Sequence, residues 1–180
     1  VDGIIGVSAG ALFGPNYYSK QKGRPLRYNQ RFCKDRRFMS IPSLLFTGNL
    51  VNKQFAFYDV TLKYDIFDNE AFIKNNTGYY VTVTNVETGK AEYLEMKDVL
   101  KEMEILRATS AIPCVSQLVE WDGKKYLDGG IADSIPVLKC KEMGYDKIIV
   151  VTTRPIDYRK KPLSSKLFKL VQLKYKKYPN

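Results

Sequence analysis

The sequence predicts an α/β fold: a three-layer α/β/α sandwich around a mostly parallel central sheet. Segments with the composition of strands alternate with segments of helical spacing along the 180 residues, as in sheets that are covered by helices. Residues 147–152, Lys-Ile-Ile-Val-Val-Thr, form an apolar run of the kind found in central parallel strands, which are buried on both faces. The hydrophobic content of 44% and the charged content of 27% are those of a globular protein.

The N-terminal half predicts a strand, a helix and a hairpin. Residues 4–7 form a short apolar run that meets a Gly/Ser/Ala turn, and the helix-compatible stretch 9–22 follows. Residues 79–85 are β-branched and aromatic, which is the composition of a strand. The turn at 87–90 then leads into a second strand at 91–96.

The C-terminal half predicts a helix, a second hairpin, another helix and a strand. Apolar residues recur near helical spacing over 99–108. An Asp-Gly turn separates the strand-like segments 115–119 and 125–127. Residues 135–143 suit a helix that ends at a glycine. The apolar run 147–152 completes the sheet.

The chain contains no histidine. This excludes Ser-His-Asp and Cys-His mechanisms and every metal site that uses imidazole. The three cysteines are widely spaced and predict neither a disulfide framework nor a zinc ribbon, so we expect a reducing, cytoplasmic location. We expect no metal or other cofactor, because no cluster of metal ligands is visible. The longest aliphatic run, residues 148–151, is far shorter than the roughly 20 residues of a transmembrane helix.

A G-x-S-x-G sequence, Gly6 to Gly10, stands between the first strand and the first helix. A nucleophilic Ser8 must protrude from a sharp strand-to-helix turn, and glycines two residues before and after it give the turn room. The following helix would direct its N–H groups, that of Ala9 first, at a developing oxyanion. The alternative is a Gly-rich turn in which Ser8 only caps the helix.

With no histidine, the base for such a serine must be another residue. Asp128 follows the apolar strand end at 126–127 and precedes Gly129 and Gly130. A carboxylate that contacts a serine hydroxyl can accept its proton during attack. Taken alone, the segment is better explained as a tight turn in which Asp128 caps a backbone N–H.

Three motifs in this order resemble the patatin-like phospholipase family, most closely its bacterial members of the predicted-esterase type. They are Gly-Val-Ser-Ala-Gly-Ala at 6–11, Ala-Thr-Ser-Ala-Ile-Pro at 108–113 and Asp-Gly-Gly at 128–130. The resemblance extends from residue 1 to about residue 153. It implies a three-layer α/β/α fold with a Ser–Asp dyad and no catalytic histidine, in which Ser8 is the nucleophile and Asp128 the base.

The resemblance also implies roles for other residues. Ser110, Pro113 and Cys114 would form the pocket wall near the dyad, although packing and turn formation explain each of them as well. The family carries a Gly-rich loop on the strand before the elbow, and the N–H groups of that loop build much of the oxyanion hole. No such segment precedes Val1. We therefore expect that the sequence lacks the first strand of the domain and that activity is weak, since loss of one oxyanion donor costs about 10²–10³ in kcat.

These observations predict a serine acyl-ester hydrolase of the phospholipase or lysophospholipase type that acts through an acyl-Ser8 intermediate. The expected partner is a lipid or another acyl ester. One alternative is a catalytically silent lipid- or protein-binding domain of the same fold, and another is an acyltransferase. The sequence specifies neither the lipid and its acyl position nor an oligomeric state.

Two basic clusters hold much of the charge in a chain with a net charge of +10. Residues 17–38 carry eight basic residues and one acid, and residues 159–177 carry eight basic residues and no acid. We therefore divide the chain into a hydrolase domain, residues 1–158, and a basic amphipathic tail, residues 159–180. The apolar residues that share part of the predicted tail helix are Leu167, Leu170, Val171 and Leu173.

The tail allows two interpretations of equal weight. It suits peripheral docking on an anionic membrane surface, because it combines lysines with an apolar face. It is equally consistent with a solvated helix that packs on the domain. No nucleic-acid partner is expected, because no recognised binding module accompanies the charge.

Overall fold

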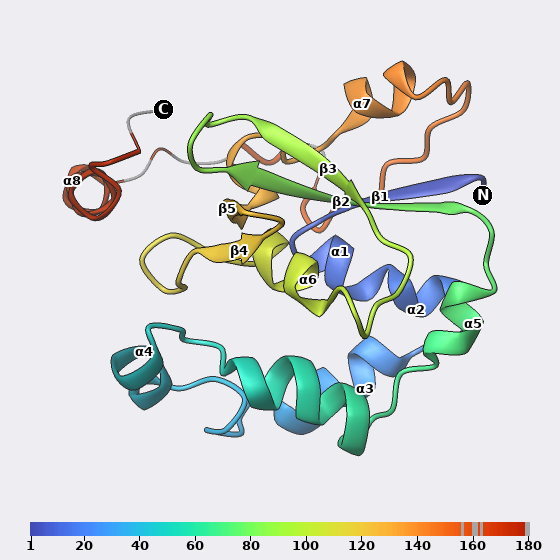
Figure 1. The fold of residues 1–180 in the computed structure, drawn as a ribbon, viewed down its shortest axis with the longest axis horizontal. Helices are drawn as coiled ribbons and strands as arrows, with labels where there is room; N and C mark the ends of the chain where they lie inside the picture. Colours follow the sequence, from blue (N-terminus) through green and yellow to red (C-terminus); the bar gives the residue numbers. More distant parts are fainter. Residues whose placement is uncertain (156, 160–161, 163, 179–180) are drawn as a thin grey trace.

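The computed structural model describes residues 1–155, 157–159, 162 and 164–178. Figure 1 shows the described elements around one sheet. In order they are β1 (Gly3–Val7), α1 (Ala9–Phe13), α2 (Pro15–Tyr18), α3 (Arg24–Phe32), α4 (Ile41–Thr47), a π-helix (Lys53–Tyr64), α5 (Asn69–Ile73), β2 (Gly78–Asn85), β3 (Ala91–Glu95), α6 (Met103–Thr109), β4 (Val119–Trp121), β5 (Lys124–Asp128), a 3-10 turn (Gly129–Ile131), α7 (Val137–Glu142) and α8 (Ser165–Lys174).

Strand β2 is the centre of a five-stranded mixed sheet. Along one edge it pairs antiparallel with β3 over residues 80–84. Its other edge is shared, because β1 pairs parallel with residues 78–82 and β5 pairs antiparallel with residues 83–85. Strand β4 pairs antiparallel with β5. The C-terminal ends of β1 and β5 therefore meet at one point along β2.

The predicted α/β class is confirmed, but the prediction of a mostly parallel sheet is wrong. The β1–β2 pair is parallel, whereas the other three pairings are antiparallel. The physical reason is that β2–β3 and β4–β5 are hairpins, and a short hairpin connection forces antiparallel pairing. The first predicted hairpin is present as β2–β3. The second is present as β4–β5 and turns at Asp122 and Gly123, which both have positive φ, but its first strand is Val119–Trp121 and not the predicted 115–119.

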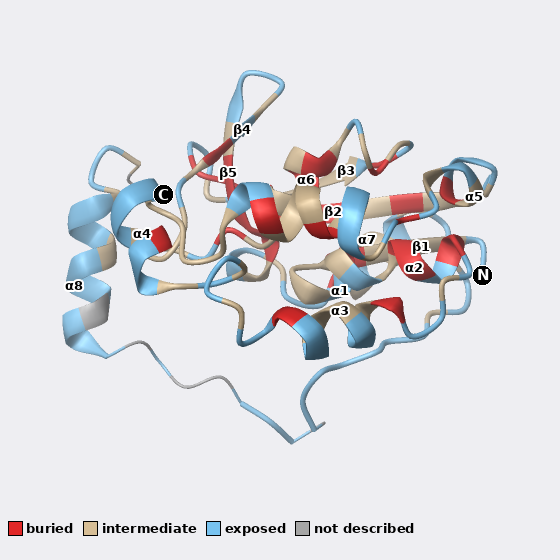
Figure 2. Ribbon diagram, turned by 90° about the horizontal axis from the view of Figure 1, so that it is seen from below, coloured by how far each residue is buried: buried red, intermediate tan, exposed pale blue. Residues whose placement is uncertain are grey.

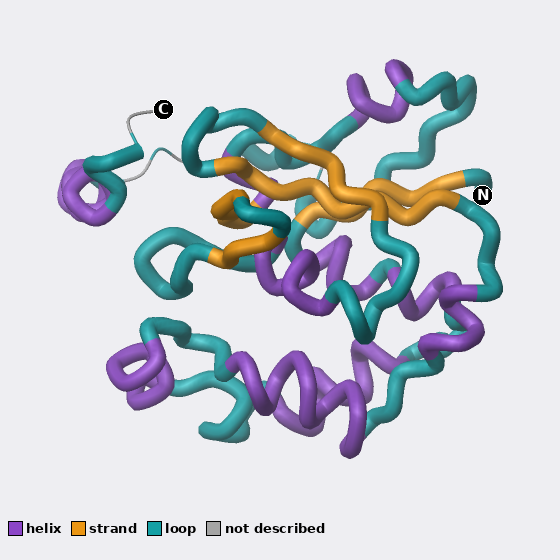
Figure 3. Tube along the Cα trace, viewed as in Figure 1, coloured by secondary structure: helices purple, strands orange, loops and turns teal. Residues whose placement is uncertain are grey.

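The prediction of a central strand at 147–152 is also wrong. The chain there forms no strand, and Figure 3 shows it as part of the loop that follows α7. Ile149 is 86% exposed and Val151 is 90% exposed, so the run is not buried on two faces. Its backbone pairs with no strand among the described residues. Apolar composition alone therefore did not establish strand pairing.

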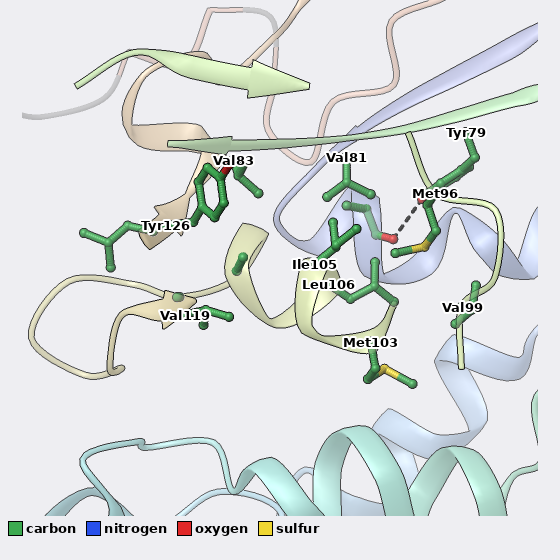
Figure 4. Close-up of a cluster of buried hydrophobic side chains, with 14 of the residues drawn as sticks. Tyr79, Val81, Val83, Met96, Val99, Met103, Ile105, Leu106, Val119 and Tyr126 are labelled. Atoms are coloured by element: carbon green, nitrogen blue, oxygen red, sulfur yellow. Dashed lines mark hydrogen bonds between the residues drawn. The ribbon is translucent and has the colours of Figure 1, made fainter. Parts of the chain in front are cut away.

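The main core lies between β2 and α6. Figure 4 shows side chains from the two elements directed at one another. On β2, Val81 and Val83 are fully buried, and on α6 Ile105 and Leu106 face them within the same apolar cluster. Alternate side chains on one face of the strand thus pack against side chains on one face of the helix. This packing sets α6, and the residues that follow it, against the middle of the sheet.

Helices α1, α2 and α6 lie on one side of the sheet, and α7 lies on the other (Figure 1). Helix α3, helix α4 and the π-helix form a further row beyond α6, held partly by a second apolar cluster around Phe32, Phe55 and Val60. Burial is concentrated at the sheet and its neighbouring helices, and α4 and α8 are largely exposed (Figure 2).

The predicted tail helix is present as α8. Two tyrosines that follow it, Tyr175 and Tyr178, pack against the main core. Of its predicted apolar residues, the side chain of Leu167 lies outside the described part of the chain. The predicted division at residues 158 and 159 stays a prediction, because residues 160, 161 and 163 beyond it also lie outside that part.

Candidate active site

Ser8 occupies a strained turn between β1 and α1. Its backbone has φ 50° and ψ −122°, a conformation that is costly for any residue other than glycine. Strain of this kind persists only where the surrounding structure enforces it, and it is often found at functional sites. The predicted strand, sharp turn and helix are therefore present in the predicted order, with Ser8 half-buried at the turn.

The two glycines of the elbow differ in their surroundings. A Cβ on the buried Gly6 would lie 2.5 Å from the Ala11 Cα, because α1 crosses close over β1. A Cβ on the exposed Gly10 would meet no heavy atom within 4 Å. The close approach that the sequence predicted on both sides of Ser8 is thus present at Gly6, and Gly10 faces open space.

This difference predicts opposite effects for two matched substitutions. We expect Gly6→Ala to lower the free energy of unfolding by about 1–3 kcal/mol, because backbone atoms of α1 must move to accept the methyl group. We expect Gly10→Ala to be neutral or to stabilise by up to about 1 kcal/mol, since alanine favours helical backbone over glycine. Urea unfolding of both variants measures the two changes, and equal destabilisation would contradict the proposed packing of the elbow.

Asp128 ends β5 and is buried, with 8% of its surface exposed. Its Oδ1 accepts a hydrogen bond from the Gly130 N–H at 2.8 Å. Asp128 therefore caps the 3-10 turn, as predicted by the interpretation of this segment as a tight turn. Its Oδ2 accepts a second hydrogen bond, from the Ser8 hydroxyl, at 2.6 Å. The carboxylate thus caps a turn with one oxygen and holds the serine with the other.

The register of the sheet explains why residues 120 positions apart meet. Val7, the last residue of β1, pairs with Thr82, and Asp128, the last residue of β5, pairs with the next residue of β2, Val83. Ser8 directly follows Val7 in the chain. The two strand ends therefore place the hydroxyl and the carboxylate side by side.

The turn after Asp128 packs closely against β2 and is hydrogen-bonded to it. A Cβ on Gly129 would fall against the Thr82 carbonyl group, so this position requires glycine for close approach. Thr84 Oγ1 donates to the Asp128 carbonyl at 2.8 Å. Neither Gly129 nor Gly130 has positive φ, so their role in the turn is close packing and, for Gly130, donation to Asp128.

A neighbouring carboxylate, Asp133, forms a hydrogen bond with a tyrosine and not with Ser8. Its Oδ2 accepts a hydrogen bond from the Tyr93 hydroxyl at 2.6 Å. Burial, and then this hydrogen bond, raise the pKa of Tyr93, so the tyrosine remains a neutral donor. Asp133 is thus hydrogen-bonded to Tyr93, and Asp128 is the carboxylate that contacts Ser8. Among the described residues, no three carboxylate, cysteine or histidine side chains gather closely enough to hold a metal ion.

Sequence reasoning did not single out Thr109, which anchors the elbow. Thr109 is fully buried; its Oγ1 accepts a hydrogen bond from the Ser8 N–H at 2.9 Å and donates one to the Thr82 carbonyl at 2.6 Å. This hydroxyl links the strained residue to the central strand. The signal that could have identified it is its place beside Ser110 in the Ala-Thr-Ser-Ala-Ile-Pro motif.

We expect Thr109→Val, which keeps the shape of the side chain, to leave the Ser8 N–H and the Thr82 carbonyl without this partner. The predicted loss is about 1–3 kcal/mol of unfolding free energy, the cost of unsatisfied buried groups. Thr109→Ser keeps the hydroxyl and serves as the matched control, losing only a buried methyl group. Urea unfolding of the two variants tests this, and equal losses would mean that the methyl group, not the hydroxyl, matters at this position.

An apolar cavity of about 220 Å³ lies between α1, α6, the π-helix and α3. Ser110 and Ala111 line it, as does Leu12 on the helix that starts at the elbow. Its lining does not include Ser8 or Asp128. It does include Ala111, whose carbonyl accepts a hydrogen bond from the Asp128 N–H at 3.0 Å.

The three residues predicted for a pocket wall are therefore placed differently. Ser110 lines the cavity, and its hydroxyl donates to the Leu106 carbonyl at 3.0 Å. Pro113 and Cys114 lie on the following loop and are not part of the lining. Cys114 adopts a positive φ of 71°, and its N–H donates to the Tyr175 hydroxyl at 3.5 Å. Ser110 therefore lies at the cavity, and Cys114 contacts Tyr175 in the tail.

Comparison with known proteins gives two matches. Residues 1–140 match the patatin-like phospholipase family. The uncharacterized protein YjjU of Escherichia coli strain K12 is 27% identical over 158 residues, which cover 86% of this chain and 44% of that protein. The chain thus spans less than half the length of this curated relative. Within the described residues, no helix has the length and hydropathy needed to cross a bilayer.

Proposed function

The chain belongs to the patatin-like phospholipase family, and we propose from this premise that it is a serine acyl-ester hydrolase that uses Ser8 and Asp128 as a dyad. The observation that carries the proposal is the hydrogen bond of 2.6 Å from the Ser8 hydroxyl to Asp128 Oδ2. This distance is within the range in which a base can take a proton from a nucleophile. The strained backbone of Ser8 supports the proposal, because it separates the hydroxyl from the neighbouring side chains.

In the first step the Ser8 Oγ attacks the carbonyl carbon of an acyl ester, and the hydroxyl proton passes to Asp128. The tetrahedral oxyanion forms beside the start of α1, where the Ala9 N–H is the nearest backbone donor along the chain. The N-terminal N–H groups of a helix have no intrahelical acceptor and stabilise negative charge. Collapse of the intermediate releases the alcohol, which takes the proton from Asp128, and leaves an acyl-Ser8 ester.

In the second step water attacks the acyl-Ser8 carbonyl while Asp128 accepts a proton from that water. Collapse releases the fatty acid and returns the proton to the Ser8 oxygen. Asp128 is suited to serve in both steps because its second oxygen is fixed by the Gly130 N–H at 2.8 Å, so the carboxylate keeps its orientation when its first partner changes.

The cavity beside the dyad supports an acyl chain as the substrate group. Its lining is largely apolar and includes Leu12, Phe57 and Leu106. At about 220 Å³ it is smaller than the roughly 300–1,000 Å³ of typical small-molecule pockets. This size favours one acyl chain over a whole lipid, so the head group would remain outside.

Release of fatty acid from a phospholipid, a lysophospholipid and a simple acyl ester tests this function directly. We expect release from at least one of the three without added metal or cofactor. Transfer of the acyl group to an added alcohol in preference to water would assign the same site to an acyltransferase. Absence of both reactions with all three esters would instead support a silent lipid-binding domain.

A further inference from the structure

Helix α4 presents apolar side chains to solvent. Phe46 is 88% exposed, Leu45 76% and Ile41 69%. Within this helix, Ser43 is the buried residue, so the usual arrangement of an amphipathic helix is reversed. The helix is nevertheless well formed, since the Ser40 hydroxyl caps it by accepting from the Ser43 N–H at 3.2 Å. Clustered exposed apolar residues of this kind mark an interaction surface.

Helix α8 adds a second exposed surface at the same end of the molecule. Figures 1 and 2 both show α4 and α8 at the end opposite the N-terminus. Phe168, Leu170 and Leu173 on α8 are exposed. Lysines are interspersed among them at 166, 169 and 174, and two more follow at 176 and 177.

The loop between α6 and β4 connects both helices to the cavity. At one point the Gln117 N–H donates to Asn49 Oδ1, two residues after α4, at 3.0 Å. At another, the Cys114 N–H contacts the Tyr175 hydroxyl, directly after α8, at 3.5 Å. Asn49 and Gln117 both line the cavity. The rim of the cavity is therefore adjacent to α4.

The two stretches of sequence that contain α4 and α8 carry basic residues and no acidic ones. The sequence has no acidic residue between Asp35 and Asp59, the stretch that contains α4, and none after Asp157, the stretch that contains α8. Among the described residues, neither helix lines the cavity, so their apolar side chains are not part of a preformed binding pocket. Protruding apolar side chains flanked by lysines match an anionic bilayer, which accepts apolar groups at its boundary and attracts cations.

We propose that α4 and α8 together form a docking surface for an anionic lipid bilayer. Phe46 and Leu45 insert at the acyl boundary, and the lysines of α8 lie against the charged head groups. Docking itself does not depend on catalysis. Docking would also bring an acyl chain to the cavity rim at Asn49 and Gln117, and this part of the inference rests on the proposed function.

Binding to lipid vesicles tests the docking surface in the Ser8→Ala background, in which no lipid is consumed. The vesicles contain phosphatidylcholine alone or equal parts of phosphatidylcholine and phosphatidylglycerol. We expect binding to the anionic vesicles that weakens as salt is added. Leu45→Ser combined with Phe46→Ser should weaken it at least tenfold, because two apolar side chains lose their burial. Replacing Lys166, Lys169 and Lys174 with Gln should weaken it about fivefold for each cation.

The matched control is Leu138→Ser on α7. Leu138 is 74% exposed and belongs to α7, a helix that Figure 1 shows away from α4 and α8. We therefore expect its substitution to leave vesicle binding unchanged. With Ser8 intact, the Leu45 and Phe46 variant should hydrolyse a water-soluble short-chain ester at the normal rate, which separates failure of docking from failure of catalysis. Equal vesicle affinity of this variant and the control would overturn the proposal. So would self-association that the variant abolishes, since that result assigns the surface to a second copy.

Discussion

Ser8→Ala is expected to reduce ester hydrolysis by about 10⁴-fold or more, the scale on which serine hydrolases lose activity without their nucleophile. The reason is that, in the part of the chain that the structure describes, Ser8 is the residue whose hydroxyl donates to Asp128 Oδ2, at 2.6 Å. The substitution removes one oxygen atom and leaves the backbone conformation of φ 50° equally strained for Ala. We therefore expect the free energy of unfolding to change by only about 1 kcal/mol. Initial rates and urea unfolding of the same preparation measure both quantities.

The matched control is Ser165→Ala, which removes an exposed hydroxyl at the start of α8. Labelling by a fluorophosphonate probe, which modifies activated serines, should persist in this control and disappear in Ser8→Ala. Full activity of Ser8→Ala would eliminate the proposed nucleophile.

Asp128→Asn is expected to lower hydrolysis by about 10²–10⁴-fold, the contribution of a general base. Asn has nearly the same shape, and its single oxygen can still accept from the Gly130 N–H, as Oδ1 does now at 2.8 Å. Its amide group would then face Ser8 where the carboxylate oxygen accepts a proton. Fluorophosphonate labelling of Ser8 should slow together with hydrolysis, because both reactions require the activated hydroxyl.

Asp133→Asn is the control for a nearby carboxylate. Asp133 accepts from Tyr93 at 2.6 Å and does not contact Ser8, so its substitution should cost about 1 kcal/mol of stability and leave the chemical step intact. If the two Asp variants lost activity equally, the assignment of the base to Asp128 would be wrong.

Ser8 and Asp128 could be selected as candidates because both residues lie at element boundaries that the local sequence marks clearly. The glycines around Ser8 mark the end of β1, and the Asp-Gly-Gly sequence that begins at Asp128 marks the end of β5. The absence of histidine left a carboxylate as the natural partner. Their contact depends on the register Val7–Thr82 and Val83–Asp128, which no local pattern specifies, and the structure was needed to show it.

The predictions of a mostly parallel sheet and of a strand at 147–152 were wrong, and the role of Thr109 was not predicted. Hydropathy measures how well a segment tolerates burial, but the direction of pairing depends on connections, and both hairpins force antiparallel neighbours. Ile149 and Val151 are exposed despite their composition. Thr109 acts through hydrogen bonds to Ser8 and Thr82, which are distant from it in sequence. Its place in the motif at 108–113 marks the segment, but not these two partners.

The most direct measurement is the mass of the peptide that contains Ser8 after brief reaction with an activated ester and quenching in acid. The dyad predicts that this peptide gains the mass of one acyl group, that Ser8→Ala gains none and that Asp128→Asn gains it more slowly. Turnover of the ester with the acyl group on another residue, or with no acylated residue at all, would contradict it.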